Sequence, residues 1–280
     1  MKRKQHTNLM LWGLIILGAG VALYVLYSSR LREGFEQPPD PDAKKPVDEA
    51  PAEKGKPAEK APDPVPIIKD VWVINLDKSK DRWNGMVEQT RMLDPLPINR
   101  WSATDGRALS EQDFIDEKIP IIIRPQKSVE ALKERRKGEI GCYLSHKKLI
   151  EFLGKQKVSD LSGHLILEDD VLIDKDTLDK WREAAPNLNS DWDICFFGIH
   201  NPVLGDVSGG IAPVKSIQSM HAYMVKHSSI PKILDIIKIM YDPIDEILRW
   251  NSDKLKMYAL QPFKIKQREN FLSDIQGFVT

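Results

Sequence analysis

The sequence has little cysteine and no excess charge of either sign. Its 280 residues include two cysteines, Cys142 and Cys195, and its 41 basic residues are balanced by 41 acidic ones. A chain with zero net charge lacks the basic footprint that general nucleic-acid binding requires. Both cysteines lie inside apolar patterns, which favours buried free thiols. A disulfide between them is the alternative if the domain lies in an oxidising compartment.

The sequence also lacks internal repeats, an Asn-x-Ser/Thr sequon and any cluster of Cys and His residues. The absence of repeats excludes a solenoid. The absence of Cys/His clusters excludes a structural zinc module. A two-metal hydrolase would need dense groups of His and Asp, which are missing as well. Any polar site must therefore be built locally, from a few side chains that the fold brings together.

An uncharged apolar run at residues 9–27 follows the basic residues Lys2, Arg3 and Lys4. A helix of this length spans about 28 Å, close to the hydrocarbon thickness of a bilayer. The flanking charges favour a cytoplasmic tail at residues 1–8. A cleaved signal peptide is the alternative, but its apolar core would be shorter, about 7 to 15 residues. We therefore expect a single-pass type II membrane protein with a lumenal or extracytoplasmic catalytic domain.

A proline-rich stalk is predicted over residues 28–66. Residues 33–66 contain nine prolines, mixed with charged residues and alanine. Such a segment buries too little apolar surface to offset the entropy lost on ordering, so we expect it to be extended and disordered. The stalk would tether a working domain at residues 67–280, the only part of the chain with a globular composition.

The working domain alternates between strand and helix patterns. Runs rich in β-branched or aromatic residues predict buried strands, and apolar residues at helical spacing predict helices. Strands are predicted over 67–76, within 97–106, over 164–168, 192–198 and 219–226, and again within 253–266. Helices are predicted within 77–93, after a cap at Ser110, and over 138–153, 177–184 and 228–240, with 124–137 as a surface segment. The alternation indicates an α/β domain with a mainly parallel sheet, whose ligands gather beyond the carboxyl ends of the strands.

Three acids, Glu168, Asp169 and Asp170, follow directly on an apolar strand in HLILEDDVLI, residues 164–173. Unpaired, these carboxylates would raise one another's pKa and weaken the fold. A divalent cation reverses that balance, and oxygen ligands suit Mg²⁺ or Mn²⁺. Because successive strand residues point to opposite faces, Glu168 and Asp170 can share a metal. On this motif alone, an acidic strand end at the surface or a helix cap is the alternative.

Two further stretches contain candidate catalytic groups. Asp245 follows a proline at the start of a predicted helix, where its carboxylate could act as a general base toward an acceptor hydroxyl. The alternative is a charge that favours the helix macrodipole. Glu139 and Asp274 are weaker candidates for the base. Ser145 and His146 are adjacent on a predicted helix and so do not face each other, which argues against a Ser–His nucleophile pair.

Seven motifs, in order along the chain, carry a resemblance to a known family. They are VWVINLDKSKDRW (71–83), WSATDG (101–106), GEIGCYLSHKKLIEF (138–152), LILEDDVLI (165–173), HAYMVK (221–226), PIDEIL (243–248), and Gln267 with SDI (273–275). In this combination the chain resembles glycosyltransferase family 25, which includes lipopolysaccharide-type glycosyltransferases and procollagen galactosyltransferases.

The resemblance implies a GT-A-like nucleotide-sugar-binding domain with a UDP-sugar donor and a divalent cation, Mn²⁺ or Mg²⁺. It implies transfer of a hexose, galactose or glucose, with inversion, to a glycan, lipid or protein acceptor. Glu168 and Asp170 would bind the metal, and Asp245, Glu168 and Asp169 would be the catalytic residues. The donor would lie near Asn75, Leu76, Arg82, Ala103, Thr104, Asp105, Gly106, Glu139, Ser145 and His146. An inactive sugar-binding or scaffold protein on the same fold is the alternative. The intact run of three acids at residues 168–170, called the acid run below, argues against it.

Overall fold

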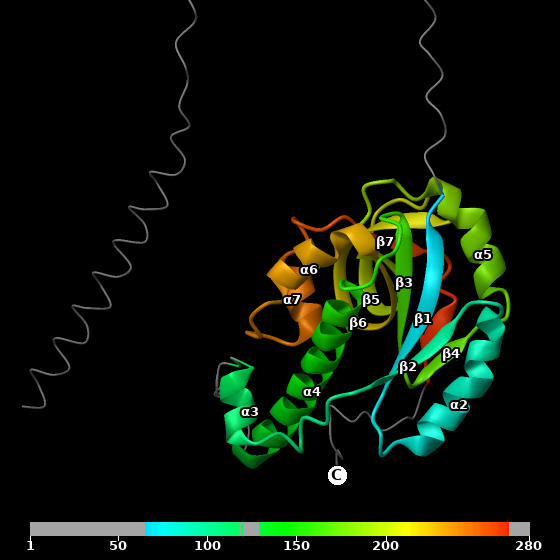
Figure 1. Ribbon diagram of the computed structural model, residues 1–280. Coiled ribbons are helices and arrows are strands. Elements are labelled where there is room, and N and C mark those ends of the chain that lie inside the picture. The colour runs from blue at the N-terminus through cyan, green and yellow to red at the C-terminus, as the bar shows by residue number, and fades with distance from the viewer. Residues whose placement is uncertain (1–64, 118, 120–128, 269–280) are drawn as a thin grey trace, which may run out of the picture. The chain divides into compact units, whose positions relative to one another are not determined.

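The computed structural model describes residues 65–117, 119 and 129–268 (Figure 1). The predicted membrane anchor at residues 9–27 and nearly all of the predicted stalk lie outside these residues. Within the described part of the chain, no helix is both long enough and apolar enough to cross a membrane.

A six-stranded sheet with the strand order β2-β1-β3-β6-β5-β7 forms the centre of the domain. Its strands are β1 (Ile67–Asn75), β2 (Ile98–Ser102), β3 (Ser162–Glu168), β5 (Ile194–Leu204), β6 (Ile211–Lys226) and β7 (Met257–Leu260). β1 pairs in parallel with β2 and β3, and β5 pairs in parallel with β7. β6 is antiparallel to β3, β5 and β7. Among these described strands only β6 runs against the others, which confirms the predicted α/β domain with a mainly parallel sheet.

Helices cover both faces of this sheet (Figure 1). They are α2 (Lys80–Thr90), α3 (Glu111–Asp116), α4 (Val129–Leu153), α5 (Thr177–Ala184), α6 (Ile230–Ile236) and α7 (Ile244–Trp250), with short 3₁₀ turns η1 (Arg91–Leu93), η2 (Ala185–Asn187) and η3 (His227–Ser229). Alternate residues of one strand serve the two faces, as a pleated backbone requires. In β1, Trp72 and Ile74 pack in the cluster that contains side chains of α4, α6 and α7. Val71 and Val73 pack in the cluster that contains side chains of α2 and α5.

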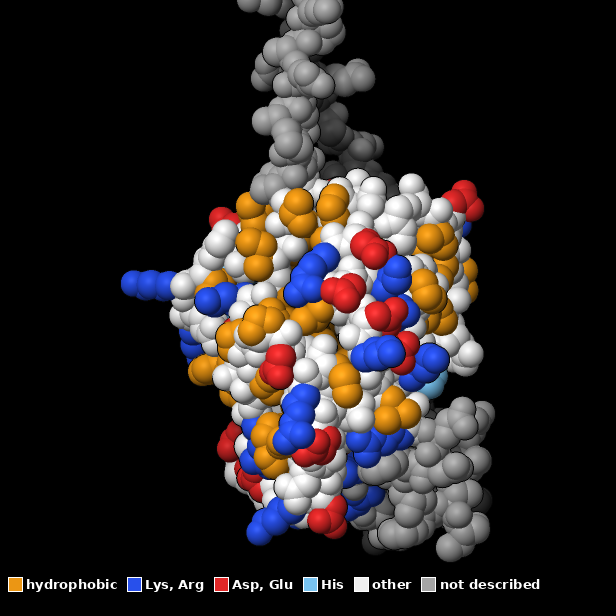
Figure 2. Space-filling model, turned by 90° about the vertical axis from the view of Figure 1, so that its right-hand side faces the viewer, with side chains coloured by type: hydrophobic (Ala, Val, Ile, Leu, Met, Phe, Trp, Pro, Cys, Tyr) orange, Lys and Arg blue, Asp and Glu red, His pale blue; other side chains and the backbone are white. Residues whose placement is uncertain are grey.

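The face that carries α2 and α5 shows basic and acidic side chains interspersed, with hydrophobic side chains between them (Figure 2). On α5, Lys180 pairs with Glu183 over 2.6 Å and Arg182 pairs with Asp179 over 2.7 Å. Exposed pairs three residues apart on a helix contribute only about 0.2–0.5 kcal/mol each. They suit a balanced surface rather than a charged binding face, in agreement with the balanced composition.

Several elements differ from the sequence prediction. β6 begins at Ile211, well before the strand predicted over 219–226, and α6 ends at Ile236, before the end of the helix predicted over 228–240. α4 begins at Val129, so most of the stretch predicted as a surface segment, residues 124–137, is helical. The stretch lacks an apolar stripe, but Glu, Ala, Leu, Lys and Arg are strong helix formers and no proline interrupts residues 129–137. The short strand β4 (Val171–Ile173) was not predicted. It exists because it pairs antiparallel with β8 (Ile265–Gln267), a partner far away in the sequence.

Other local predictions are confirmed. Ser110 caps α3, and it forms a reciprocal capping box with Asp113. The helix predicted over 177–184 has the bounds of α5. Cys142 and Cys195 are free thiols, as favoured by their apolar surroundings. The carboxyl ends of β1, β2 and β3 meet at one edge of the sheet, where the acid run emerges.

Candidate functional site

A cleft of about 540 Å³ opens at this edge of the sheet. It is bounded by the ends of β1, β2 and β3, by α4 and by the start of α7. Of the residues predicted for the site, those that line the cleft are Leu76, Arg82, Ala103, Thr104, Asp105, Gly106, Glu139, Ser145, His146, Glu168, Asp169, Asp170 and Asp245. Segments that are far apart in the sequence therefore converge on one hollow, as expected for an α/β sheet that binds a ligand at its carboxyl edge.

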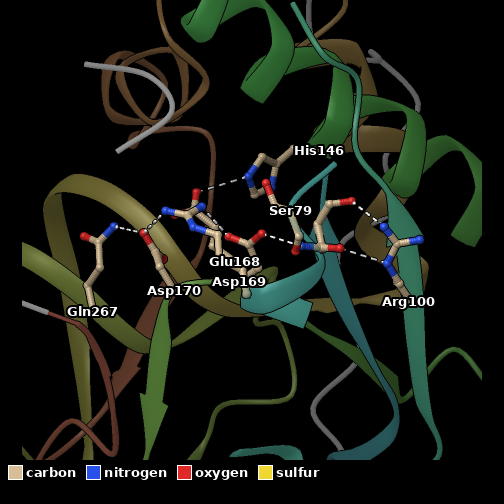
Figure 3. A network of polar contacts seen from close by, with 9 residues as sticks. Ser79, Arg100, His146, Glu168, Asp169, Asp170 and Gln267 are labelled. Carbon is tan, nitrogen blue, oxygen red and sulfur yellow. Dashed lines mark hydrogen bonds and ion pairs between the residues drawn. The ribbon is translucent and has the colours of Figure 1, made fainter. Parts of the chain in front are cut away.

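Asp169 is held on both of its carboxylate oxygens by protein donors. Arg82 Nη1 donates to Oδ1 over 2.7 Å, and Asn75 Nδ2 donates to Oδ2 over 2.6 Å. Figure 3 shows these contacts leading away from Asp170 toward Arg100. Charge-assisted hydrogen bonds of this length are strong and directional. Both oxygens of Asp169, which was predicted to be catalytic, therefore accept hydrogen bonds from protein donors. These bonds hold the acid run in position.

Asn75 lies behind the cleft and does not line it. It is 1% exposed, and its amide also donates to the carbonyl of Ser79 and accepts from Nε of Arg100. The sequence prediction placed Asn75 near the donor; in the structure its side chain links the ends of β1 and β3. The physical reason is its position as the last residue of β1, directly beside the acid run that follows β3.

Glu168 faces His146 of α4, with 3.4 Å between Oε1 and Nε2. The other ring nitrogen of His146, Nδ1, lies 2.8 Å from the buried hydroxyl of Tyr223. Burial opposes ionisation of Glu168, but the contact with His146 and the positive charge of Arg82 hold its pKa below the ordinary value. Glu168 is therefore a carboxylate at neutral pH, and its side chain remains 23% exposed to the cleft.

The two oxygens of the Asp170 carboxylate have different surroundings. Gln267 Nε2 donates to its Oδ2 over 2.8 Å, and Arg82 Nη2 is 4.0 Å from the same oxygen. Oδ1 is buried and has no hydrogen-bond partner among the described residues. Burial, followed by the negative charge of Glu168, raises the pKa of Asp170 to about 6. A buried carboxylate oxygen without a donor, beside a second ionised acid, is the arrangement that a divalent cation relieves.

The loop that carries Ala103, Thr104, Asp105 and Gly106 is fastened to α4 through glycine contacts. A Cβ on Gly106 would lie 1.8 Å from the carbonyl oxygen of Lys137, and one on Gly141 would lie 2.7 Å from the carbonyl oxygen of Thr104. Only glycine permits this approach of two backbones. The motifs ATDG and GEIGC are therefore two halves of a single packing contact.

Ser145 completes the same contact. Its hydroxyl donates to the carbonyl of Gly141 over 2.6 Å and accepts from the backbone N–H of Thr104 over 2.9 Å. Ser145 is 2% exposed. Ser145 was predicted to lie near the donor; it lines the wall of the cleft, and its hydrogen bonds hold the loop on α4. Glu139, another residue of α4, pairs with Arg136 over 3.3 Å.

Asp245 lines the cleft from the first turn of α7. Its Oδ2 accepts from the backbone N–H of Ser219 over 2.8 Å. Ser219 has a φ of 63°, a left-handed conformation that is costly for a residue other than glycine. Its hydroxyl accepts from the backbone N–H of His200 over 3.3 Å. Asp245 is thus fixed in place by a strained residue of β6 as well as by the helix that carries it.

Three residues of the cleft received no role from the residue pattern. His200 and Gln267 are joined by a 2.7 Å contact between Nε2 and Oε1, and Cys142 lies on the wall formed by α4. Gln267 could have been singled out only through its place in the family motif near the carboxyl end. Nothing in the sequence singled out His200 or Cys142 as functional, because each lies inside an apolar pattern that core packing alone explains.

Comparison with known protein families supports the resemblance seen in the sequence. Residues 68–198 match the model described as Glycosyltransferase family 25 (LPS biosynthesis protein). The match confirms the resemblance to glycosyltransferase family 25 that the sequence motifs carry, and it supports a glycosyltransferase. The family 25 region runs from β1 into β5, so it contains the acid run and the motifs of α4 but neither Asp245 nor Gln267.

Other comparisons add little. None of the curated proteins matches the chain. A solved structure, that of mannose-1-phosphate geranyltransferase from Thermus thermophilus, is similar with 7% identity and a TM-score of 0.30, covering 72% of this chain and 74% of that chain. A likeness at this level carries no argument about the site.

Proposed function

We propose that this family 25 domain transfers a hexose, galactose or glucose, from a UDP-sugar to a hydroxyl group of a glycan, lipid or protein acceptor, with inversion at the anomeric carbon. The observation that carries the proposal is the pairing of Glu168, ionised and partly exposed, with the buried Oδ1 of Asp170, which has no hydrogen-bond partner in the described part of the chain. Both line one cleft with the loop of residues 103–106. A sugar nucleotide needs this combination, because its diphosphate must be neutralised as it leaves.

Glu168 and Asp170 would hold a divalent cation, Mn²⁺ or Mg²⁺. Oxygen ligands and room for substrate phosphate suit both ions. When bound, the cation supplies charge neutralisation for the departing UDP. The protein's own contribution is to hold the two ligands in place. Asp169 does this through Arg82 and Asn75, and Gln267 does it by anchoring Oδ2 of Asp170.

Asp245 is the proposed general base. The acceptor hydroxyl would donate its proton to the Asp245 carboxylate while its oxygen bonds to the anomeric carbon, and the bond from that carbon to the UDP oxygen would break on the opposite face. Ser219 binds Oδ2 of Asp245, which leaves Oδ1 for the acceptor hydroxyl. Asp245 also lies in the first turn of α7, where a negative charge interacts favourably with the helix dipole. The pH–rate experiment below distinguishes this role from that of a general base.

UDP release tests the proposal directly. The full chain, incubated with Mn²⁺ and each of a panel of nucleotide sugars, is expected to release UDP from one UDP-hexose and to stop when EDTA is added. Asp170→Asn is expected to abolish release, and the exposed Asp191→Asn is the matched control. No release with any donor would favour the inactive sugar-binding or scaffold protein.

The role of Asp245 is tested by the pH–rate profile. Asp245→Asn is expected to lower the transfer rate by about 10²–10⁴-fold and to remove the acidic limb of the profile, because general-base catalysis contributes about that much. Asp253→Asn, on the exposed turn after α7, is the control. An unchanged profile in Asp245→Asn would leave this residue with the helix-dipole role alone.

We also propose that residues 9–27 anchor the enzyme as a type II membrane protein, with the catalytic domain lumenal or extracytoplasmic. The uncharged run and the preceding basic residues support this topology. Protease added to sealed membrane vesicles of known orientation tests it. Digestion of the catalytic domain from the cytoplasmic side would refute the proposed orientation.

A further inference from the structure

Three side chains of different chemistry meet on the α4 side of the cleft. Cys142 and His146 are four residues apart on α4 and therefore share a face of the helix. Glu168, at the end of β3, faces them across the gap. One donor atom from each, a thiol sulfur, an imidazole nitrogen and a carboxylate oxygen, all lie within 4.8 Å of one another. The proposed transfer mechanism uses Glu168 but gives no task to the thiol.

We infer that Cys142, His146 and Glu168 form a second metal site, selective for a borderline-soft divalent cation such as Zn²⁺. Thiolate, imidazole and carboxylate are the ligand types that zinc takes, whereas Mn²⁺ and Mg²⁺ prefer oxygen. Three protein ligands leave the fourth tetrahedral position open to water. This site differs from the proposed Glu168–Asp170 site in two of its three ligands.

The distances fit this assignment. Two ligands bonded to zinc at about 2.0–2.1 Å in a tetrahedral arrangement stand about 3.4 Å apart. Nε2 of His146 and Oε1 of Glu168 are separated by 3.4 Å, which is long for a charge-assisted hydrogen bond. The thiol sulfur of Cys142 lies within 4.8 Å of a ring nitrogen of His146 and a carboxylate oxygen of Glu168, so a small side-chain movement brings it to bonding distance.

Tyr223 prepares His146 for this role. Its buried hydroxyl lies 2.8 Å from Nδ1 of His146, on the side of the ring away from the cleft. A hydrogen bond at one ring nitrogen fixes the orientation of the imidazole and directs the other nitrogen at the metal. The hydroxyl can accept from Nδ1–H, and this tautomer leaves the lone pair on Nε2, facing Glu168 and Cys142.

Metal binding would change the state of Cys142. Burial, followed by the negative charge of Glu168 and Asp245, raises the pKa of the free thiol well above its ordinary value. The thiol is therefore protonated and unreactive at neutral pH without a metal. Coordination deprotonates a thiol, so binding of Zn²⁺ releases one proton to solvent and forms the sulfur–zinc bond.

The shared ligand gives the site a regulatory consequence, which rests on the proposed function. Glu168 cannot bind both cations with full strength. Its oxygen toward His146 would coordinate zinc, and its negative charge would be neutralised there. Zinc is therefore expected to inhibit Mn²⁺-supported transfer, and removal of zinc by a chelator followed by fresh Mn²⁺ is expected to restore it.

Cobalt(II) tests the site without any activity assay, because thiolate bound to Co²⁺ gives a near-ultraviolet charge-transfer band that nitrogen and oxygen ligands do not give. The full chain, purified in detergent and titrated with Co²⁺, is expected to develop this band, and Zn²⁺ is expected to remove it. Cys142→Ser is expected to abolish the band. Cys195→Ala removes the other thiol and is the matched control, with the band retained.

Tyr223→Phe is a second variant, which keeps all three ligands and the core volume. It is expected to weaken Co²⁺ binding by about 10–100-fold, the usual effect of losing the partner of a metal-bound histidine. Asp170→Asn is expected to keep the band, since Asp170 belongs to the other site. A missing band in the wild-type chain, or a band that persists in Cys142→Ser, overturns the inference.

Zinc inhibition then separates the two proposals. In the wild-type chain, Zn²⁺ is expected to inhibit transfer, and in Cys142→Ser the concentration for half inhibition is expected to rise at least about tenfold, each protein being compared with its own zinc-free rate. A cobalt band in a chain that transfers no sugar would refute the proposed function and leave the metal site standing. Transfer without a band, insensitive to zinc, would refute the site alone.

Discussion

Gln267 donates a hydrogen bond from Nε2 to Oδ2 of Asp170 over 2.8 Å. This contact fixes which way round the Gln267 amide lies, because a carboxylate can only accept. Oε1 of Gln267 must then accept from Nε2–H of His200, 2.7 Å away. The backbone N–H of His200 in turn binds Ser219, the residue that holds Asp245. His200 and Gln267 thus connect the proposed metal ligand with the proposed base.

Gln267→Ala is expected to lower transfer by about 10–100-fold and to raise the Mn²⁺ concentration needed for half-maximal rate, since loss of a residue that orients a metal ligand has effects of this size. The rate as a function of Mn²⁺ concentration is the measurement. Gln218→Ala, which removes an exposed glutamine bonded to Asn201, is the control. An unchanged Mn²⁺ dependence in Gln267→Ala would show that Asp170 needs no anchor.

Asp170→Asn is expected to stabilise the cation-free domain at neutral pH while abolishing transfer. Burial, followed by the charge of Glu168, raises the pKa of Asp170 from 3.8 to about 6 in the folded state. Below about pH 4 the carboxyl is protonated in both the folded and the unfolded chain, so the group does not lower the free energy of unfolding. Above about pH 6 the folded chain carries a charge that it disfavours, at a cost on the order of 3 kcal/mol.

The measurement for Asp170→Asn is the free energy of unfolding by denaturant in EDTA. At pH 7.5 the variant is expected to exceed the wild type by on the order of 2–3 kcal/mol, and the gap is expected to close as the pH falls toward 4. Asp191→Asn, an exposed substitution, serves as the control at both pH values. Equal stability at pH 7.5 would mean that the acid run is not strained without its cation.

Asn75→Ala is expected to destabilise the domain by about 1–3 kcal/mol, the cost of removing a hydrogen bond from a buried charged group. The group is the carboxylate of Asp169, whose Oδ2 accepts from Nδ2 of Asn75 over 2.6 Å. Thermal unfolding measures the loss, and transfer should fall with it because the acid run is no longer braced. Asn99→Ala, which removes only a 3.4 Å hydrogen bond to a β1 carbonyl, should change stability by less than about 0.5 kcal/mol. Equal losses in both variants would contradict a special role for Asn75.

Gly106→Ala is expected to prevent the loop of residues 103–106 from docking on α4. Its Cβ would lie 1.8 Å from the carbonyl oxygen of Lys137, and neither backbone can yield without moving the cleft wall. Loss of UDP binding, measured by calorimetry, and a lowered melting temperature are the expected results. At Gly205 an added Cβ would meet only ordinary contacts of 3.5 Å or more with Pro213, so Gly205→Ala is the tolerated counterpart. Wild-type UDP affinity in Gly106→Ala would refute the packing argument.

Much of the fold could be predicted because it depends on local patterns. The cores of β1, β3 and β5 are continuous apolar runs, and such runs predict buried strands wherever they occur. Ser110 predicts a helix start, and in the structure its capping hydrogen bonds with Asp113 lie within four residues of chain. The start of α4 was missed for a related reason. Residues 129–137 are favourable for helix formation but lack the apolar stripe on which the prediction relied.

The sequence alone determined that an acid run would stand at the end of a buried strand, and that a cation or basic groups must meet it, because like charges in one place cannot remain unpaired. Only the tertiary structure decided which acids are already satisfied. Asp169 meets Asn75 across 94 positions, and Asp170 meets Gln267 across 97. Contacts over such separations are set by strand pairing and helix packing, which no local pattern encodes. They engage both oxygens of Asp169 and leave Oδ1 of Asp170 as the oxygen with a place for a metal ion.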